Sequence, residues 1–382
     1  MSLKFGFGIS YLVVYDAGAA RVHGRCMKVF PCNFRLPHCL LLLLLMCLLF
    51  VPVTVVAASV NDPYVSQQWG WRRVKGDLAY DAGYSGEGVV VALLDTGVDV
   101  SHPDLAENLM EGWNFVDNNG NVTDVDGHGT MVAGIVAAAA NNGIGVAGVA
   151  SNVTIMPLKV ISESGGSLID INLAIRYAAD NGADVIGMSL GGTLTKGSIA
   201  METAVNYAYQ KGCVLVAAAG NNDTTEPFYP AAYENVIAVS AINETDQKAS
   251  FSNYGDYIDF CAPGVNIVTT GKDGGYVSGS GTSFAAPFVT GVVAVMLSKY
   301  PSLSNGNVTE TLRAQAEDLG EEGWDPFYGW GLVDAYDAGS LPPVPETSST
   351  ILFIAVTSAT IMIFALKKTR DPAKLEKNTA TP

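Results

Sequence analysis

One serine lies in a run of small residues that suits a nucleophile. The run Ser278–Pro287 precedes a continuous apolar stretch that begins at Val289. This pattern predicts a loop that leads into the N-terminus of a buried helix. Backbone N–H groups and the helix dipole at such a position favour an anion that forms beside the Ser283 hydroxyl. Because a serine hydroxyl is a weak nucleophile, Ser283 needs a base close by.

The choice of base is narrow because the chain has only 4 histidines. His23 and His38 lie in an N-terminal segment that we expect to be removed from the mature protein, and His102 precedes a proline in an acidic loop. His128 opens a second apolar run of small residues. It is therefore the strongest candidate for the general base.

A third group must orient the imidazole of such a base. The apolar run 89–94 reads as a buried strand and ends at Asp95. An aspartate at the C-terminal end of a buried parallel strand is placed for function rather than for packing. Asp95, His128 and Ser283 also follow one another in an order that recurs among serine hydrolases.

These segments resemble a known family. Asp95-Thr96-Gly97, His128-Gly129-Thr130 and Gly281-Thr282-Ser283 are similar to the three signatures of the subtilisin-like serine proteases. Ala217–Asn221 resembles the segment that carries the family's oxyanion asparagine, and the similarity runs from about residue 62 to 338, closest to the thermitase-like branch. Each motif is short, but four in order at family-like spacing are specific. The resemblance implies Ser283 as nucleophile, His128 as base, Asp95 as its partner and Asn221 as oxyanion donor.

The resemblance also implies a substrate-binding cleft. Ser189-Leu190-Gly191 is similar to the edge against which substrate backbone pairs as an added strand, which predicts broad sequence selectivity. Ala218 and Gly220 would line the S1 pocket, with Asn222 beside it. These small walls suggest a preference for a medium or large apolar P1 side chain.

Calcium is implied in the same way. Asp62 and Asp104 match the two carboxylates of the family's strong calcium site. Its remaining ligands would be the side-chain oxygen of Asn142 and the backbone carbonyls of Ala139, Ile144 and Val146, an oxygen-only set that suits calcium. A second site would map to Asn114, Asp117, Asn119, Asn121 and Thr123, but two of its acids are asparagine here.

Apolar strand patterns alternate with helical patterns along the body of the chain. The predicted strands are Val89–Leu94, Thr154–Val160, Val185–Ser189, Val214–Ala219, Val236–Ala241 and Ile258–Ala262. The predicted helices are His128–Ala140, Ile169–Asn181, Ile199–Lys211, Ser283–Tyr300 and Val308–Ala316. Such alternation predicts an α/β fold with a mainly parallel sheet. The family fold implied is a three-layer α/β/α sandwich.

Composition narrows the partners and the redox chemistry. The 382-residue chain has a formal net charge of −16, which argues against nucleic acid as a partner and leaves carboxylates available for calcium. Cys213 and Cys261 are the only cysteines in the main body, and both lie in apolar runs. We expect two buried free thiols, because the family fold needs no disulfide. We also expect a monomer.

The first 58 residues read as a leader. The apolar run 39–56 and the small residues that follow it predict a secretory signal peptide cleaved after Ala58. The alternative is an uncleaved N-terminal anchor. Residue 59 would then open a catalytic domain that extends to 340, with no room for the folding propeptide that secreted relatives usually carry. We therefore expect that the domain folds unaided or with help from another chain.

A second apolar run lies near the C-terminus. Residues 341–348 form a proline-rich linker, 349–366 is a charge-free run long enough for a transmembrane helix, and 367–382 is a basic tail. The basic cluster predicts that the tail is cytoplasmic and the catalytic domain extracellular. A cleaved sorting signal is the alternative, and the enzyme could also be released as a secreted form.

The function predicted is that of an exported, membrane-anchored serine endopeptidase with protein or peptide substrates. Two alternatives remain open: a catalytically impaired binding module with the same fold, and a processing protease with narrow specificity. Phe284, which stands where the family usually has methionine, supports the first alternative. A metalloprotease is disfavoured because the sequence has no His-Glu-x-x-His motif.

Overall fold

The computed structural model describes residues 60–193, 197–340 and 342. The leader 1–58 and the segments 343–348, 349–366 and 367–382 lie outside the described residues. The cleavage site, most of the linker, the transmembrane helix and the basic tail therefore stay predictions. Among the described residues, α7 (Thr282–Lys299) is the one helix long and apolar enough to cross a membrane, and 83% of it is buried in the protein.

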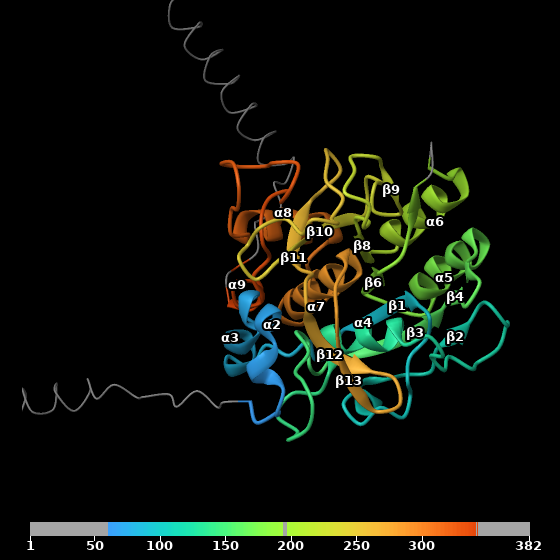
Figure 1. The fold of residues 1–382 in the computed structure, drawn as a ribbon. Coiled ribbons are helices and arrows are strands. Elements are labelled where there is room, and N and C mark those ends of the chain that lie inside the picture. The colour runs from blue at the N-terminus through green and yellow to red at the C-terminus, as the bar shows by residue number, and fades with distance from the viewer. Residues whose placement is uncertain (1–59, 194–196, 341, 343–382) are drawn as a thin grey trace, which may run out of the picture. The chain divides into compact units, whose positions relative to one another are not determined.

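A seven-stranded sheet forms the middle of the body (Figure 1). Its strand order is β11-β10-β8-β6-β1-β3-β2, and every neighbouring pair is parallel. The strands are β1 Val90–Asp95, β2 Trp113–Asn114, β3 Thr154–Lys159, β6 Val185–Met188, β8 Val214–Ala218, β10 Ile237–Ile242 and β11 Phe260–Pro263. The prediction of a mainly parallel sheet is confirmed.

Helices cover both faces of this sheet (Figure 1). They are α2 Trp69–Arg73, α3 Gly76–Asp81, α4 His128–Ala137, α5 Leu168–Asp180, α6 Ile199–Gln210, α7 Thr282–Lys299, α8 Asn305–Gln315 and α9 Ala335–Ser340, with 3-10 turns η1 Val65–Gln67 and η2 Ala106–Asn108. Three short antiparallel pairs flank the sheet: β4 Ile161–Ser162 with β5 Gly165–Gly166, β7 Gly192–Thr193 with β9 Phe228–Tyr229, and β12 Ile267–Gly271 with β13 Gly275–Gly279.

Alternate residues of each central strand enter different cores. In β1, Val91 and Leu93 belong to the core on the side of α4 and α7, whereas Ala92 and Leu94 belong to the core on the side of α5 and α6. Because successive strand side chains point to opposite faces, both faces of a sheet covered by helices must be apolar. This explains the unbroken apolar runs in the sequence and yields three layers.

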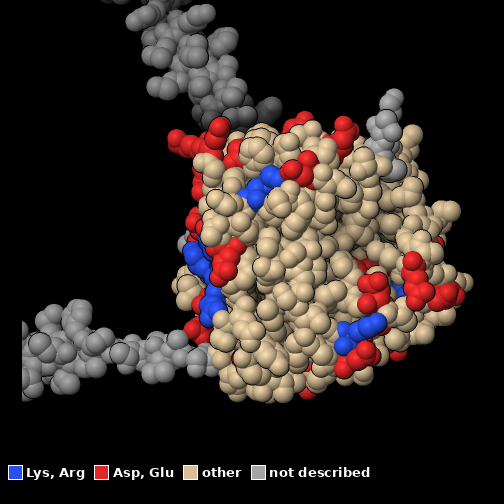
Figure 2. Space-filling model, in the orientation of Figure 1, with Lys and Arg blue, Asp and Glu red and all other residues tan. Residues whose placement is uncertain are grey.

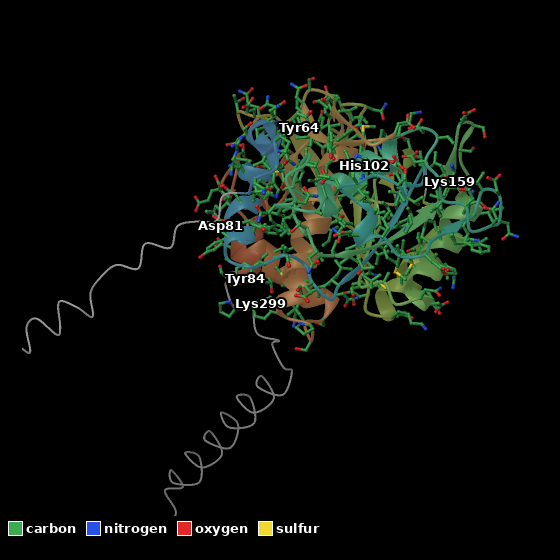
Figure 3. All side chains as sticks on the ribbon, turned by 90° about the horizontal axis from the view of Figure 1, so that it is seen from below. Tyr64, Asp81, Tyr84, His102, Lys159 and Lys299 are labelled. Atoms are coloured by element: carbon green, nitrogen blue, oxygen red, sulfur yellow. The ribbon has the colours of Figure 1, made fainter. Side chains whose placement is uncertain are left out.

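The central helix α7 is buried on almost all sides. Its residues from Phe284 to Met296 are all buried, and its last residue, Lys299, lies over the ring of Tyr84 (Figure 3). A helix that is apolar all round belongs in a core. Consequently, the N-terminus of α7, where Ser283 lies, is held at a fixed place relative to the sheet.

The chain order places a crevice at the end of β1. From β1 the chain builds β2 and β3 on one side, then continues with β6, β8, β10 and β11 on the other. In open α/β sheets, ligands bind beyond the carboxyl ends of the strands where the order reverses. Asp95 ends β1, and Ser189 directly follows β6.

Candidate active site

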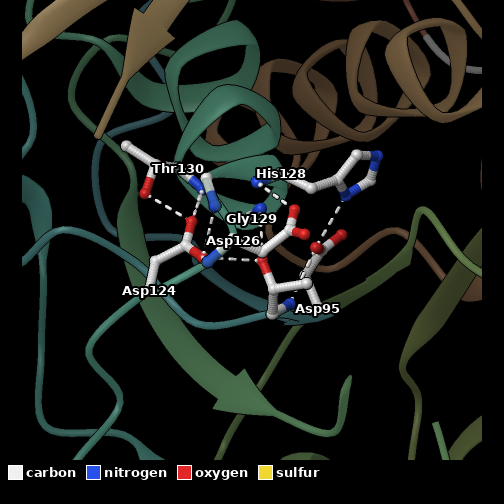
Figure 4. Close-up of polar contacts among 8 residues, drawn as sticks. Asp95, Asp124, Asp126, His128, Gly129 and Thr130 are labelled. Atoms are coloured by element: carbon white, nitrogen blue, oxygen red, sulfur yellow. Dashed lines mark hydrogen bonds and ion pairs between the residues drawn. The ribbon is translucent and has the colours of Figure 1, made fainter. Parts of the chain in front are cut away.

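Asp95 and His128 meet at the end of β1 (Figure 4). The Nδ1 of His128, the first residue of α4, lies 2.7 Å from Oδ1 of Asp95. That oxygen also accepts the Thr96 N–H at 2.8 Å, and the Asp95 side chain is buried. The carboxylate therefore accepts a hydrogen bond from Nδ1–H, which keeps the proton of the neutral ring on Nδ1 and leaves Nε2 unprotonated, as a general base requires.

The charge of Asp95 controls the imidazole. Together with smaller contributions from Asp126 and Asp124, it raises the pKa of His128 to about 9, against the opposing effect of burial. A nearby opposite charge favours the protonated ring. The imidazolium that would form during proton transfer is stabilised in the same way.

A second carboxylate, Asp124, organises the first turn of α4 and was not predicted. Its Oδ1 accepts the N–H of Gly127 at 2.8 Å and the Thr96 hydroxyl at 2.9 Å. Its Oδ2 accepts the N–H and the hydroxyl of Thr130 at 2.9 and 2.7 Å (Figure 4). Asp124 thus caps the helix that carries His128 and ties it to the end of β1. The available signal was an acid four residues before the histidine at a predicted helix start.

Close backbone approach explains a glycine of the histidine motif. A Cβ at Gly129 would overlap the carbonyl oxygen of Gly97 and lie 3.1 Å from the Cβ of Asp95. Only a residue without a side chain lets α4 start this close to the end of β1. The spacing between Asp95 and His128 depends on this contact.

Ser283 and Asn221 face one another across Gly281. A Cβ at Gly281 would lie 2.9 Å from Oγ of Ser283 and 3.4 Å from Nδ2 of Asn221. The Asn221 Oδ1 accepts the N–H of Thr282 at 2.8 Å and its hydroxyl at 3.0 Å, which fixes the amide with its NH₂ group, like the serine hydroxyl, close to Gly281. This is the arrangement that an oxyanion donor needs.

One cleft of about 470 Å³ brings the reactive side chains together. Its lining includes His128, Asn221 and Ser283, and it includes every predicted substrate-binding residue except Asn222: Ser189, Leu190, Gly191, Ala218 and Gly220. Asn222 is exposed and its backbone N–H donates to Asn253 at 2.8 Å, so the structure places it outside the lining. His128 and Ser283 share the cleft without a direct hydrogen bond between their side chains, a common state of catalytic groups without substrate.

Phe284 packs behind the histidine instead of entering the cleft. It is buried, and its ring lies edge-on to the His128 ring with centroids 6.0 Å apart. Phe284 is not among the residues that line the cleft. The aromatic residue that replaces the family's usual methionine therefore supports the imidazole without narrowing the oxyanion site.

Other reactive side chains have structural surroundings. His102 is fully buried, with Nε2 2.9 Å from the carbonyl of Gly275 and Nδ1 accepting the N–H of Asp104 (Figure 3). Cys213 and Cys261 are buried and free, which confirms the expected thiols. Burial raises the pKa of the Cys213 thiol to about 11, so it stays protonated near neutral pH.

Four of the predicted calcium ligands, Asp62, Asp104, Asn142 and Val146, lie close together. Asp62 accepts the N–H groups of Asn141, Asn142 and Gly143, and Asp104 accepts the N–H of Val146 and the side-chain amide of Asn142. Burial raises the pKa of Asp62, and the charge of Asp104 raises it further. Both acids are buried, and in the described part of the chain neither pairs with lysine or arginine.

The donor set fits a hard cation. Two buried carboxylates of like charge are costly without a counter-ion. No group of three or more His, Cys, Asp or Glu side chains gathers among the described residues, so a metal here would depend on carbonyl and amide oxygens. The Asn142 amide presents its nitrogen to Asp104 at 2.6 Å, and it would have to turn over to offer its oxygen.

The second predicted set forms its own hydrogen-bonded loop. Asn114 bonds the side chain and N–H of Asp117, and the side-chain oxygens of Asn119 and Asn121 accept the N–H groups of Asn121 and Thr123. Each of these asparagine oxygens accepts one hydrogen bond within the loop.

Comparisons with known proteins agree with this geometry. Residues 86–331 match the model of the subtilase family. Thermitase from Thermoactinomyces vulgaris is 44% identical over 282 residues, which cover 73% of this chain and 98% of thermitase. A thermophilic serine proteinase from Bacillus sp. strain AK1 is 43% identical over 284 residues, 74% of this chain and 69% of that protein. A solved protease structure from Pseudoalteromonas arctica aligns with a TM-score of 0.69 at 32% identity, covering 74% of this chain and 99% of that one.

Proposed function

Because the chain belongs to the subtilase family of serine endopeptidases, we propose that it hydrolyses peptide bonds with Ser283, His128 and Asp95 as its catalytic triad. One observation carries the assignment. His128, which contacts Asp95 at 2.7 Å, lines the same cleft as Ser283 and Asn221. Residues 62–338 form the subtilisin-like α/β fold that surrounds this cleft.

The chemistry follows the roles of these groups. His128 takes the proton of Ser283 through Nε2 while Oγ attacks the carbonyl carbon of the substrate. The oxyanion that forms accepts hydrogen bonds from the Asn221 side chain and the Ser283 N–H. The imidazolium, held by Asp95, then gives its proton to the leaving amine, and an acyl-enzyme remains. Water, activated by the same imidazole, releases the acid and restores Ser283.

Substrate backbone binds along one edge of the cleft. Ser189, Leu190 and Gly191 follow β6 and line the cleft, so an extended peptide can pair with them as an added strand. Main-chain pairing does not depend on the substrate's side chains, which supports broad specificity. A preference for an apolar P1 side chain would come from the small residues Ala218 and Gly220. A neighbouring apolar hollow of about 220 Å³ shares Leu190 and Gly191 with the cleft and can hold a further side chain.

Calcium is proposed as a structural ion. Asp62, Asp104, the turned amide of Asn142 and the carbonyls of Ala139, Ile144 and Val146 would hold it. Bound there, it would neutralise two buried carboxylates and tie the residues before α2 to the loop after α4. Its role is stability rather than chemistry, because this set is separate from the residues that line the cleft.

The proposed location is the cell surface. The leader 1–58 would direct export, and the segment 349–366 would anchor the enzyme with its catalytic domain outside and tail 367–382 inside; a released form remains an alternative. An acidic monomer with no nucleic-acid partner fits the net charge of −16. Mass spectrometry of both mature termini, on a sample of measured activity, tests signal cleavage and tail processing together.

Casein turnover tests the enzyme assignment. The wild-type protein, folded and loaded with calcium, is expected to degrade casein, and Ser283→Ala is expected to lose this activity while keeping its fold. An inactive wild type with native circular dichroism would favour the binding module instead. Cleavage of one peptide among many would favour the narrow processing protease.

A further inference from the structure

Phe228 contributes an aromatic ring to the lining of the cleft. It is half-buried and begins β9, in the irregular stretch between β8 and β10. The same cleft contains Ser283 and the substrate edge formed by Ser189, Leu190 and Gly191. A ring at this position lies within the space that a substrate side chain would enter.

The ring lies against one glycine on each side. Gly191 of the substrate edge forms one wall and Gly220, predicted to line the S1 pocket, forms the other, and a Cβ on either glycine would approach ring atoms of Phe228 to under 3.0 Å. Real side chains do not come this close, so the ring leaves no room for even a methyl group between itself and either glycine. Phe228 therefore lies between the two walls.

The backbone holds the ring in this position. Thr193 pairs with Phe228 and Gly192 with Tyr229 in the β7–β9 ladder, which directly follows the substrate edge. The carbonyl of Phe228 also accepts the N–H of Ala232 at 2.9 Å. Displacing the ring would require either a rotamer change between two close walls or the loss of this ladder.

We infer that Phe228 closes the S1 pocket and restricts cleavage to bonds after small P1 side chains, such as alanine. The inference rests on the proposed endopeptidase function and narrows its substrate class. Glycine and alanine in the walls predicted room for a medium or large side chain. The Phe228 ring occupies that room, so the space left for a P1 side chain is smaller than the glycine and alanine walls alone would allow.

A series of succinyl-Ala-Ala-Pro-X-p-nitroanilide substrates tests this, with X as alanine, leucine or phenylalanine. In the wild type, kcat/KM for alanine should exceed that for phenylalanine by at least about tenfold, since even small misfits in apolar pockets have effects of this size. Phe228→Ala should raise the ratio of kcat/KM for phenylalanine to that for alanine by at least about tenfold. Phe228→Leu should shift the preference in the same direction but less.

Phe115→Ala is the matched control, because Phe115 is also half-buried and does not line the cleft. Concentrations are corrected by fluorophosphonate titration of Ser283, so misfolded protein is not counted. The inference is overturned if the wild type prefers phenylalanine, or if Phe228→Ala changes all three substrates equally. Failure of the proposed function looks different: neither titration nor hydrolysis of any substrate would be seen, and both claims would fall together.

Discussion

At the scale of residues, His128 joins two sets of carboxylates with different tasks. Asp95 contacts the His128 ring. Asp124 instead accepts hydrogen bonds from the N–H of Gly127 and from the N–H and hydroxyl of Thr130, on either side of His128. Asp126 adds a hydrogen bond to the His128 N–H at 3.1 Å. His128 is therefore fixed both through its imidazole ring and through its backbone N–H.

The raised pKa of His128 predicts an alkaline activity profile. The base must be neutral to accept the Ser283 proton, and a pKa of about 9 keeps it protonated at neutral pH. We expect kcat/KM to increase as the pH rises from 7 and to level off above about 9. Initial rates on a neutral peptide substrate between pH 6 and 11 measure this. A plateau already reached at pH 7 would contradict the strong influence of Asp95.

Asn221 provides a second prediction at this scale. Asn221→Ala removes a donor aimed at the developing oxyanion, so kcat should fall by about 100- to 1,000-fold with little change in KM. This is the range found for the oxyanion asparagine of subtilisin, a relative of this chain. A comparable increase in KM would instead assign Asn221 to ground-state binding.

At the scale of elements, strand ends and helix starts position the whole site. The predicted sheet strands and long helices form within a few residues of their expected bounds, because long apolar runs covered on both faces give a strong signal. The helix expected at Val308–Ala316 instead starts at Asn305, where the Ser304 side chain caps it by accepting the N–H of Asn307. The pairs β4–β5, β7–β9 and β12–β13 were not predicted, since they are short and carry little periodicity.

The site residues also divide into those with a clear local sequence pattern and those without one. Asp95, His128, Ser283 and Asn221 were identifiable because each stands in a compact motif. Asp124 acts mainly on its own turn, where an acid four residues before the histidine was the one local signal. Phe228 matters through contacts with Gly191 and Thr193, which no local pattern reveals. Asn222 was placed by resemblance alone, and the structure leaves it outside the cleft.

Asp124 carries the prediction that belongs to the elements. Asp124→Asn places amide hydrogens against N–H groups that now donate to a carboxylate, and each buried donor left unpaired costs about 1–3 kcal/mol. We expect a lower free energy of unfolding and a lower kcat, because the start of α4 loosens. Urea unfolding and steady-state kinetics measure both.

Asp126→Asn is the control for this variant. Asp126 is exposed and accepts one hydrogen bond, from the His128 N–H, so its replacement should change stability little. Equal effects of the two substitutions would show that Asp124 does not organise the helix start.

At the scale of the whole molecule, the proposed calcium site would connect distant parts of the chain. The face over α4, α7 and the β12–β13 hairpin carries few charged side chains, and acids lie mainly toward its edges (Figure 2). Asp62 and Asp104 differ from these surface acids, because both are buried. A cation between them would join parts of the chain that are distant in sequence.

Chelation is expected to destabilise the protein as a whole. EDTA should lower Tm, added calcium should restore it, and the gain should grow with calcium concentration because the ion binds only the folded state. Differential scanning calorimetry measures the shift. Asp104→Asn should remove most of the response. If Asp117→Asn removes it instead, the ion is held by the loop from Asn114 to Thr123.

The most direct test of the central claim is labelling with a fluorophosphonate followed by peptide mapping. The account predicts a single phosphonylated residue, Ser283, in the folded, calcium-loaded wild type, no labelling of Ser283→Ala, and much slower labelling of His128→Ala. Labelling at another residue, or a folded wild type that resists the reagent, would contradict the assignment of Ser283, His128 and Asp95 as one catalytic unit.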